Sequence, residues 1–134
     1  MEESYPPKSF KGIFDHARQR GMKLKAHVGE FGSAEMVRHT VEVLELDEVQ
    51  HGVNAASSVE VMKWLSRNKI MLNVCPTSNV MLGVAESLGT HPIRKLFDHG
   101  VMVSINTDDL MIFGQSVSEE YLNLYECVRF RGRT

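Results

Sequence analysis

The sequence has few cysteines, and those it has form no recognisable pattern. Its 134 residues include only Cys75 and Cys127, which lie far apart in the chain. They form neither a Cys-x-x-Cys motif nor the cysteine framework of a small secreted domain. This pattern favours a reducing compartment.

Long apolar runs and a strong excess of one charge are also missing. No apolar run approaches the roughly 20 residues that are needed to span a bilayer. The acidic start Met1-Glu2-Glu3-Ser4 is not followed by the apolar segment of a signal peptide. The formal net charge is −2, so nothing draws the chain to nucleic acid or to an acidic membrane. We therefore expect a cytoplasmic protein with neither nucleic-acid nor membrane partners.

The composition that remains is that of a folded domain. Hydrophobic residues make up 43% of the chain and charged residues 24%, which is typical of globular proteins. The length is sufficient for one domain with its own core. We interpret residues 1–9, which contain Pro6-Pro7, as a linker or frayed end, residues 10–130 as the domain, and residues 131–134 as a polar tail.

Apolar patterning alternates between short strands and amphipathic helices. Strands are predicted over 22–28, around Val49, over 70–74 and over 101–106. Helices are predicted over 10–20, 33–44 and 93–98, and after the capping boxes Ser57-x-x-Glu60 and Ser116-x-x-Glu119. One helix followed by four strand–helix units predicts an α/β fold with parallel strands and right-handed crossovers.

The stretch from Val101 to Asp109, VMVSINTDD, predicts a buried strand that ends at two adjacent carboxylates. In an α/β barrel, the C-terminal ends of the strands carry the active site. Adjacent acids at such a place repel each other unless a positive or proton-donating group lies nearby. An alternative is that Thr107-Asp108-Asp109 forms a loop and a helix N-cap.

The other predicted strands end in residues that can also take part in chemistry. His27 and Glu30 follow the first strand and His51 the second, while Cys75, Ser78 and Asn79 follow the third. Parallel strands present these ends on one side, where two histidines and two or three acids suit a divalent metal such as zinc. Taken singly, His27 could be a core histidine, Glu30 a solvated carboxylate at a helix start, and His51 a turn residue.

The remaining cysteine and histidines have simpler interpretations. Cys75 precedes Pro76, so a structural strand terminus is favoured over a soft metal ligand. The other four histidines fall on predicted helices or at their ends, and we expect surface or capping roles for them: His16, His39, His91 and His99.

Four motifs in this order and spacing resemble the adenosine/AMP deaminase family, whose members are metal-dependent amidohydrolases with (β/α)8 barrels. They are His27-Val-Gly-Glu30, His51-Gly52, Cys75-Pro76-Thr77-Ser78-Asn79 and Ser104-Ile-Asn-Thr-Asp-Asp109. The resemblance covers residues 10–130. It implies deamination of a purine nucleoside, adenosine plus water giving inosine plus ammonia, by a metal-activated water.

The resemblance also implies a role for each matching residue. His27 and Asp108 would be metal ligands, and His51 would orient or deprotonate the attacking water. Glu30 would protonate the purine ring, Gly29 would offer its backbone N–H to the base, and Asp109 would bind its five-membered ring. A Zn²⁺ ion is therefore implied for the intact parent protein.

Three departures from the family pattern accompany the match. Val28 replaces the usual alanine, and Leu110 replaces the proline that usually follows the paired aspartates. The third departure is that the chain has no His-x-His pair, which supplies the family's other metal ligands, and only four of the eight strands of a barrel. The resemblance therefore implies a C-terminal half barrel that binds zinc weakly or not at all and is inactive alone.

A half barrel has two unpaired sheet edges and an uncovered inner face, which favour association. We therefore expect self-association or pairing with a missing N-terminal half. Two alternatives stay open for the function: half of another amidohydrolase, acting on adenine or a modified adenosine, or a non-catalytic α/β assembly module.

Overall fold

Four parallel strands form a single sheet in the computed structural model, which describes residues 5–128. The sheet order is β1-β2-β3-β4, so each strand pairs with the next one along the chain. The register pairs Val28 with His51 and Val74 with Ile105. The strands are β1 (Lys25–Val28), β2 (Glu48–His51), β3 (Met71–Val74) and β4 (Met102–Ile105). This sheet confirms the predicted C-terminal half of a (β/α)8 barrel.

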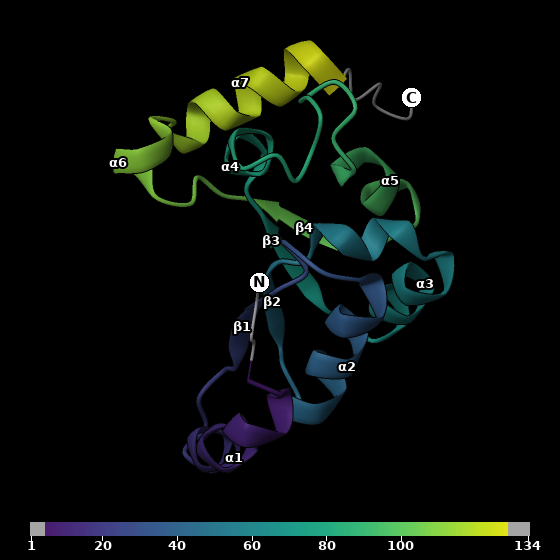
Figure 1. The fold of residues 1–134 in the computed structure, drawn as a ribbon, viewed down its shortest axis with the longest axis vertical. Coiled ribbons are helices and arrows are strands. Elements are labelled where there is room, and N and C mark those ends of the chain that lie inside the picture. Colours follow the sequence, from purple (N-terminus) through teal and green to yellow (C-terminus); the bar gives the residue numbers. More distant parts are fainter. Residues whose placement is uncertain (1–4, 129–134) are drawn as a thin grey trace.

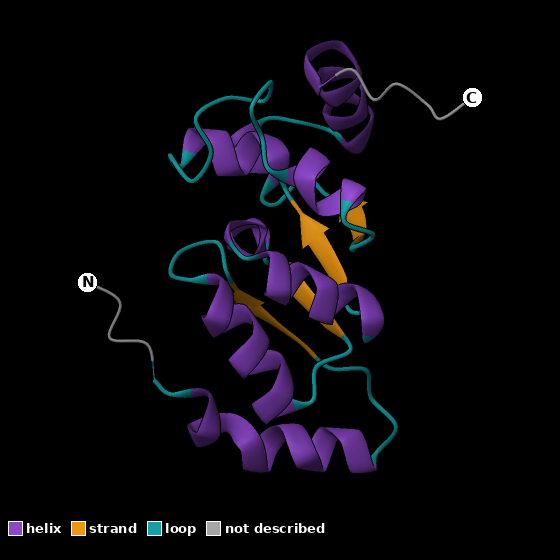
Figure 2. Ribbon diagram, turned by 90° about the vertical axis from the view of Figure 1, so that its right-hand side faces the viewer, coloured by secondary structure: helices purple, strands orange, loops and turns teal. Residues whose placement is uncertain are grey.

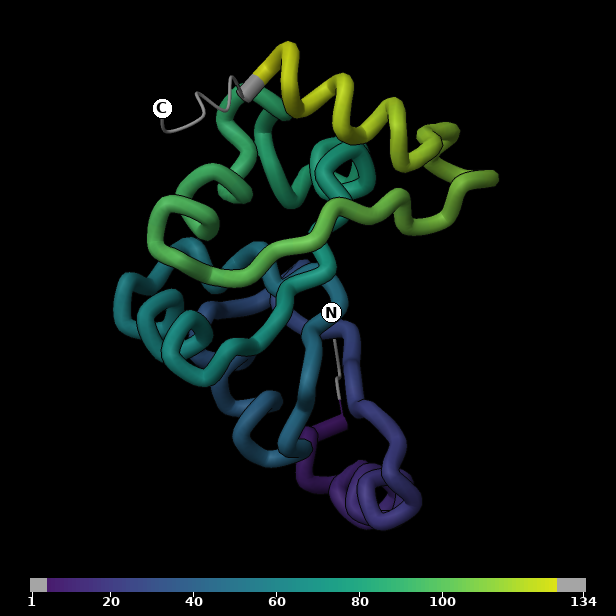
Figure 3. Tube along the Cα trace, turned by 180° about the vertical axis from the view of Figure 1, so that it is seen from behind, coloured from purple at the N-terminus to yellow at the C-terminus, as the bar shows by residue number. Residues whose placement is uncertain are grey.

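Helices connect the strands and cover one face of the sheet (Figures 1 and 2). The α-helices are α1 (Lys11–Gln19), α2 (Ala34–Leu44), α3 (Val59–Arg67), α4 (Pro76–Met81), α5 (Ile93–Asp98), α6 (Leu110–Phe113) and α7 (Val117–Val128). Two 3-10 turns are η1 (Pro7–Phe10) and η2 (Val53–Ser57). The trace in Figure 3 places α4, α6 and α7 at the end of the molecule opposite α1. None of the helices within residues 5–128 combines the length and apolar character that a membrane crossing needs.

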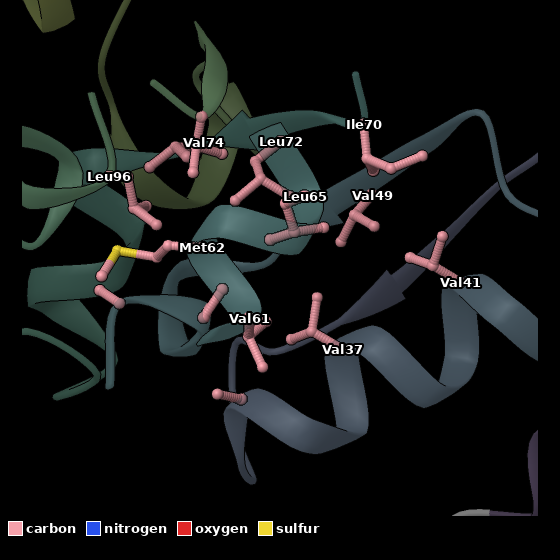
Figure 4. Close-up of a cluster of buried hydrophobic side chains, with 14 of the residues drawn as sticks. Val37, Val41, Val49, Val61, Met62, Leu65, Ile70, Leu72, Val74 and Leu96 are labelled. Carbon is pink, nitrogen blue, oxygen red and sulfur yellow. The ribbon is translucent and has the colours of Figure 1, made fainter. Parts of the chain in front are cut away.

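The hydrophobic core lies between the sheet and these helices. Val49 and Leu72 point from the strands toward Val37 of α2 and Leu65 of α3, and all four side chains are fully buried (Figure 4). Alternate residues of a strand face opposite sides of the sheet. Most apolar residues of the strands therefore belong to the helix-covered side, while Met71 and Met102 fall in the row of Glu48 on the opposite face.

The opposite face of the sheet is uncovered and mostly polar. Asn73 donates to the Glu48 carboxylate at 3.1 Å, and the Ser104 hydroxyl donates to Asn73 Oδ1 at 2.6 Å. Lys25 and His27 of β1 are exposed on this face. Met71 and Met102 are the apolar strand residues on this face, and the other apolar side chains of the strands lie on the helix side. Among the described residues, exposed apolar side chains gather instead on α6 and α7: Leu110, Met111, Ile112, Tyr121, Leu122 and Tyr125.

Several local predictions are confirmed and others need correction. Ser33 accepts from the Met36 N–H, and Ser116 and Glu119 form a reciprocal capping box. The cap of α3 is Ser58 rather than Ser57, because η2 delays the helix start by one residue.

No helix was predicted over α4, which is short and carries no long apolar stripe, whereas α6 begins where the alternative interpretation had a helix N-cap. Residues 7–9, expected within a linker, belong to the turn η1. Residues 1–4 and the predicted tail, 131–134, lie outside the described part of the chain.

Candidate active site

The C-terminal ends of all four strands meet at one place, as the parallel topology requires. His51 forms the centre of the cluster because it ends β2 and lies between the residues that follow β1 and β4. Its Nδ1 lies 3.4 Å from Glu30 Oε1, and its Nε2 lies 3.9 Å from Asp108 Oδ2. The His27 ring is tilted against it, with ring centroids 5.3 Å apart. These residues lie up to about 80 positions apart in the sequence.

His51 is held by the fold in a position that keeps it neutral. Its side chain is 2% exposed, and its φ of 67° lies in the left-handed region that non-glycine residues rarely adopt. Burial lowers the pKa of the imidazole, while the carboxylates of Glu30 and Asp108 act in the opposite direction. A neutral imidazole between two acids can accept a proton, as a general base must.

The loop that carries Glu30 is fixed by glycine and by Asn54. Gly29 has a φ of 74°, and a Cβ there would lie 2.3 Å from Val37 Cγ2. Asn54 donates its backbone N–H to Gly29 O at 2.9 Å and its side-chain amide to Glu30 O at 3.0 Å and Gly32 O at 3.2 Å. These contacts hold the backbone on both sides of Glu30, so its carboxylate stays directed at His51.

The two adjacent aspartates have different environments. Asp108 has a φ of 59°, and its Oδ2 accepts a 2.7 Å hydrogen bond from the Ser78 hydroxyl on α4. Asp109 is the N-cap of α6, and its Oδ1 accepts from the backbone N–H groups of Met111 and Ile112 at 2.9 and 3.1 Å. Asp108 therefore faces the cluster, whereas the N-cap interpretation is confirmed for Asp109.

Cys75 lies beneath the cluster as a buried thiol. Burial raises its pKa to about 12, so the sulfur is protonated at neutral pH. The Gln50 side-chain amide donates to it at 3.6 Å. Ligand atoms of Cys75, His51 and Asp108 all lie within 4.8 Å of one another.

The donor set has the chemistry of a zinc site. Imidazole and carboxylate are ordinary zinc ligands. Here the His51 ring lies beside the His27 ring and 3.9 Å from Asp108 Oδ2, although His27 is not in the group of ligand atoms within 4.8 Å. Glu30 Oε1 and His51 Nδ1 are buried 3.4 Å from each other, and neither makes a hydrogen bond with the described residues. Unsatisfied buried polar atoms of this kind need a further polar partner. The residues present therefore fit a divalent metal, although they supply fewer than the four ligands of a complete zinc site.

Some residues near the site were missed or misjudged from the sequence. His91 is buried rather than at the surface, although its Nδ1 does cap α5 by accepting from the Ile93 N–H at 3.0 Å. His16, His39 and His99 are exposed, as expected. Neither Asn54 nor Glu120 was singled out. For Glu120 a signal existed, because it lies four residues before the buried Leu124 on one helix face.

Comparison with known proteins gives consistent matches along the chain. The family model described as adenosine deaminase matches residues 1–134. A Treponema pallidum protein described as an adenosine/adenine deaminase is 50% identical over 115 residues, which is 86% of this chain and 38% of that protein. The adenosine deaminase of Plasmodium vivax is 38% identical over 126 residues, covering 92% of this chain and 35% of the relative.

Solved structures agree with these matches. The adenine deaminase of Arthrobacter aurescens superimposes with a TM-score of 0.89 at 30% identity, over 97% of this chain and 40% of that one. A zinc-bound amidohydrolase of Burkholderia ambifaria gives a TM-score of 0.83 at 28% identity, over 100% of this chain and 37% of its own. The chain thus spans little more than a third of the length of the proteins it matches.

Proposed function

This chain belongs to the adenosine deaminase family, and from that membership we propose that it is the C-terminal half of a zinc-dependent purine deaminase. The reaction would replace the amino group of adenosine, adenine or a modified adenosine by oxygen and release ammonia. The observation that carries the proposal is the position of the neutral His51 ring between the carboxyl groups of Glu30 and Asp108.

His27 and Asp108 would hold the zinc ion, together with ligands from the part of the barrel that this chain does not include. When bound, the metal would lower the pKa of a water molecule so that it can attack at neutral pH. The Burkholderia ambifaria amidohydrolase contains bound zinc, which supports zinc as the metal. Without the other ligands, we expect the chain to bind zinc weakly and to be inactive alone.

The residues around the metal would each transfer a proton or bind part of the substrate. His51 would accept a proton from the attacking water, because its buried ring is neutral. Glu30 would deliver a proton to the purine ring nitrogen beside the attacked carbon, and Gly29 would donate its backbone N–H to the purine. Asp109 would bind the five-membered ring while its Oδ1 caps α6.

A chimera gives the test. The chain replaces the matching 115 residues of the Treponema pallidum protein, which then supplies the other half of the barrel. We expect the chimera to release ammonia from adenosine or adenine, and Glu30→Gln or His51→Ala to reduce the rate at least about 100-fold. A folded, zinc-loaded chimera that deaminates neither of these compounds nor a modified adenosine would contradict the proposal and favour a non-catalytic assembly module.

We further propose that the chain pairs through its sheet edges with a second copy or with a complementary half barrel. In the described residues, β1 and β4 each pair on one side only, and unpaired edges favour association. Light scattering after size-exclusion chromatography tests this. A monomer at low micromolar concentration would contradict self-association.

A further inference from the structure

Glu120 of α7 is a fully buried carboxylate that the proposed mechanism does not use. Its side chain is 0% exposed, and burial raises the pKa of the carboxyl group. Both of its oxygens lie 3.3 Å from the backbone nitrogen of Thr77, which donates to them. A buried acid that is directed at one backbone N–H, 43 positions away in the sequence, requires a structural reason.

The reason lies at the start of α4, the short helix that follows β3. Its first residue, Pro76, has no N–H, and the N-cap residue Cys75 makes no side-chain capping hydrogen bond. The first-turn N–H groups of a helix need an acceptor from elsewhere, and a carboxylate is favoured there. Glu120 supplies the acceptor that the local sequence lacks.

The turn that Glu120 caps also carries the hydrogen bond to the proposed metal ligand. Ser78, the residue after Thr77, donates its hydroxyl to Asp108 Oδ2 at 2.7 Å. Asp108 has a positive φ of 59°, a conformation that non-glycine residues keep only when the surrounding structure holds them. The same Oδ2 lies 3.9 Å from His51 Nε2.

We propose that Glu120 is a positioning residue: by capping α4 it holds Ser78 so that the Asp108 carboxylate stays directed at His51. The consequence of this positioning for catalysis rests on the proposed function, in which Asp108 is a metal ligand. The positioning itself is a property of the chain alone and is measurable without any deamination.

The test follows the ¹³C carboxyl signal of Asp108 by NMR in the isotope-labelled chain. Ser78→Ala removes the hydroxyl and defines the shift that loss of its hydrogen bond produces. Glu120→Ala should move the signal in the same direction, whereas Glu120→Gln should stay near the wild type because its amide oxygen still accepts from Thr77. Leu124→Ala is the matched control, since Leu124 is 2% exposed on the same helix and belongs to the hydrophobic core.

An unmoved Asp108 signal in Glu120→Ala would overturn the proposal. An equal shift in Leu124→Ala would also overturn it, because general loosening of α7 would then explain the effect. If Glu120→Ala fails to fold, Glu120→Asp replaces it, because the shorter side chain keeps the carboxyl group but withdraws from Thr77. The Asp108 signal in this variant must then move toward its position in Ser78→Ala. Failure of the deaminase proposal would appear only in the chimera and would leave these results unchanged.

Discussion

Lowering the pH should destabilise this fold, in large part through the buried histidine His91. The ring is 3% exposed, and its Nδ1 accepts from the Ile93 N–H, so its Nε2 carries the proton and donates to Asn79 Oδ1 at 3.2 Å. Burial lowers the pKa of His91 from 6.5 to about 4. The folded state therefore keeps the ring neutral at a pH where the unfolded chain binds a proton.

The sign and size of the effect follow from this difference in pKa. The contribution of His91 to the free energy of unfolding is fully present above pH 6.5. It is lost as the pH falls toward 4, since only the unfolded state gains the proton in that window. Each unit of pKa difference corresponds to 1.36 kcal/mol, so the full loss is about 3 kcal/mol. Glu120 acts in the opposite direction, because its raised pKa lets the folded state bind a proton first.

Urea unfolding, followed by circular dichroism between pH 7 and pH 4, measures this loss. Comparison of the wild type with His91→Gln isolates the histidine, since the other titrating groups are common to both. The variant should be less stable at pH 7, yet its free energy of unfolding should fall less steeply below pH 6.5. Parallel pH curves for the two proteins would refute the reasoning.

Three further substitutions test the loops that hold the site. Gly29→Ala should lower the free energy of unfolding by about 2–4 kcal/mol, because its Cβ would meet Val37 at 2.3 Å; a melting temperature equal to that of the wild type would contradict the close approach of Gly29 to Val37. Asn54→Ala loses two hydrogen bonds to the loop and should cost about 1–2 kcal/mol; urea midpoints measure it, and Asn54→Asp should fail to restore stability since it cannot donate. Asp109→Ala removes the cap of α6 and should speed amide exchange in that helix about fivefold, whereas Asp109→Asn should not; equal rates in all three proteins would argue against the cap.

The convergence of the site could be predicted from the sequence because it depends on topology. Once the strands are parallel and each is followed by a helix, the residues after each strand must meet at one end of the sheet. His51 and Asp108 come together for this reason. The core was predictable on the same basis, since apolar side chains such as Val49 and Leu72 occupy one face of short strands.

The supporting contacts could not be predicted in this way. Asn54 binds a loop 22 to 24 positions away, and Glu120 caps a helix 43 positions away. No local sequence pattern predicts contacts between residues this far apart in the chain. The left-handed backbone at His51 and Asp108 has only a weak signature in the sequence, because histidine and aspartate adopt a positive φ much less often than glycine does.

The polar inner face explains how half of a barrel can be an ordered unit. In these strands the side that faces the helices carries most of the apolar residues, while the other side carries Glu48, Asn73 and Ser104, which form hydrogen bonds with one another. An uncovered face of this kind loses little by contact with water, since its hydrogen bonds are already made within the sheet. Stability and catalysis therefore depend on different faces of the sheet. The apolar core on the helix side stabilises the fold, whereas the inner face and the site at its edge need the rest of the barrel. The His91 substitution should accordingly change stability without bearing on catalysis, whereas the catalytic role proposed for His51 requires the complete barrel.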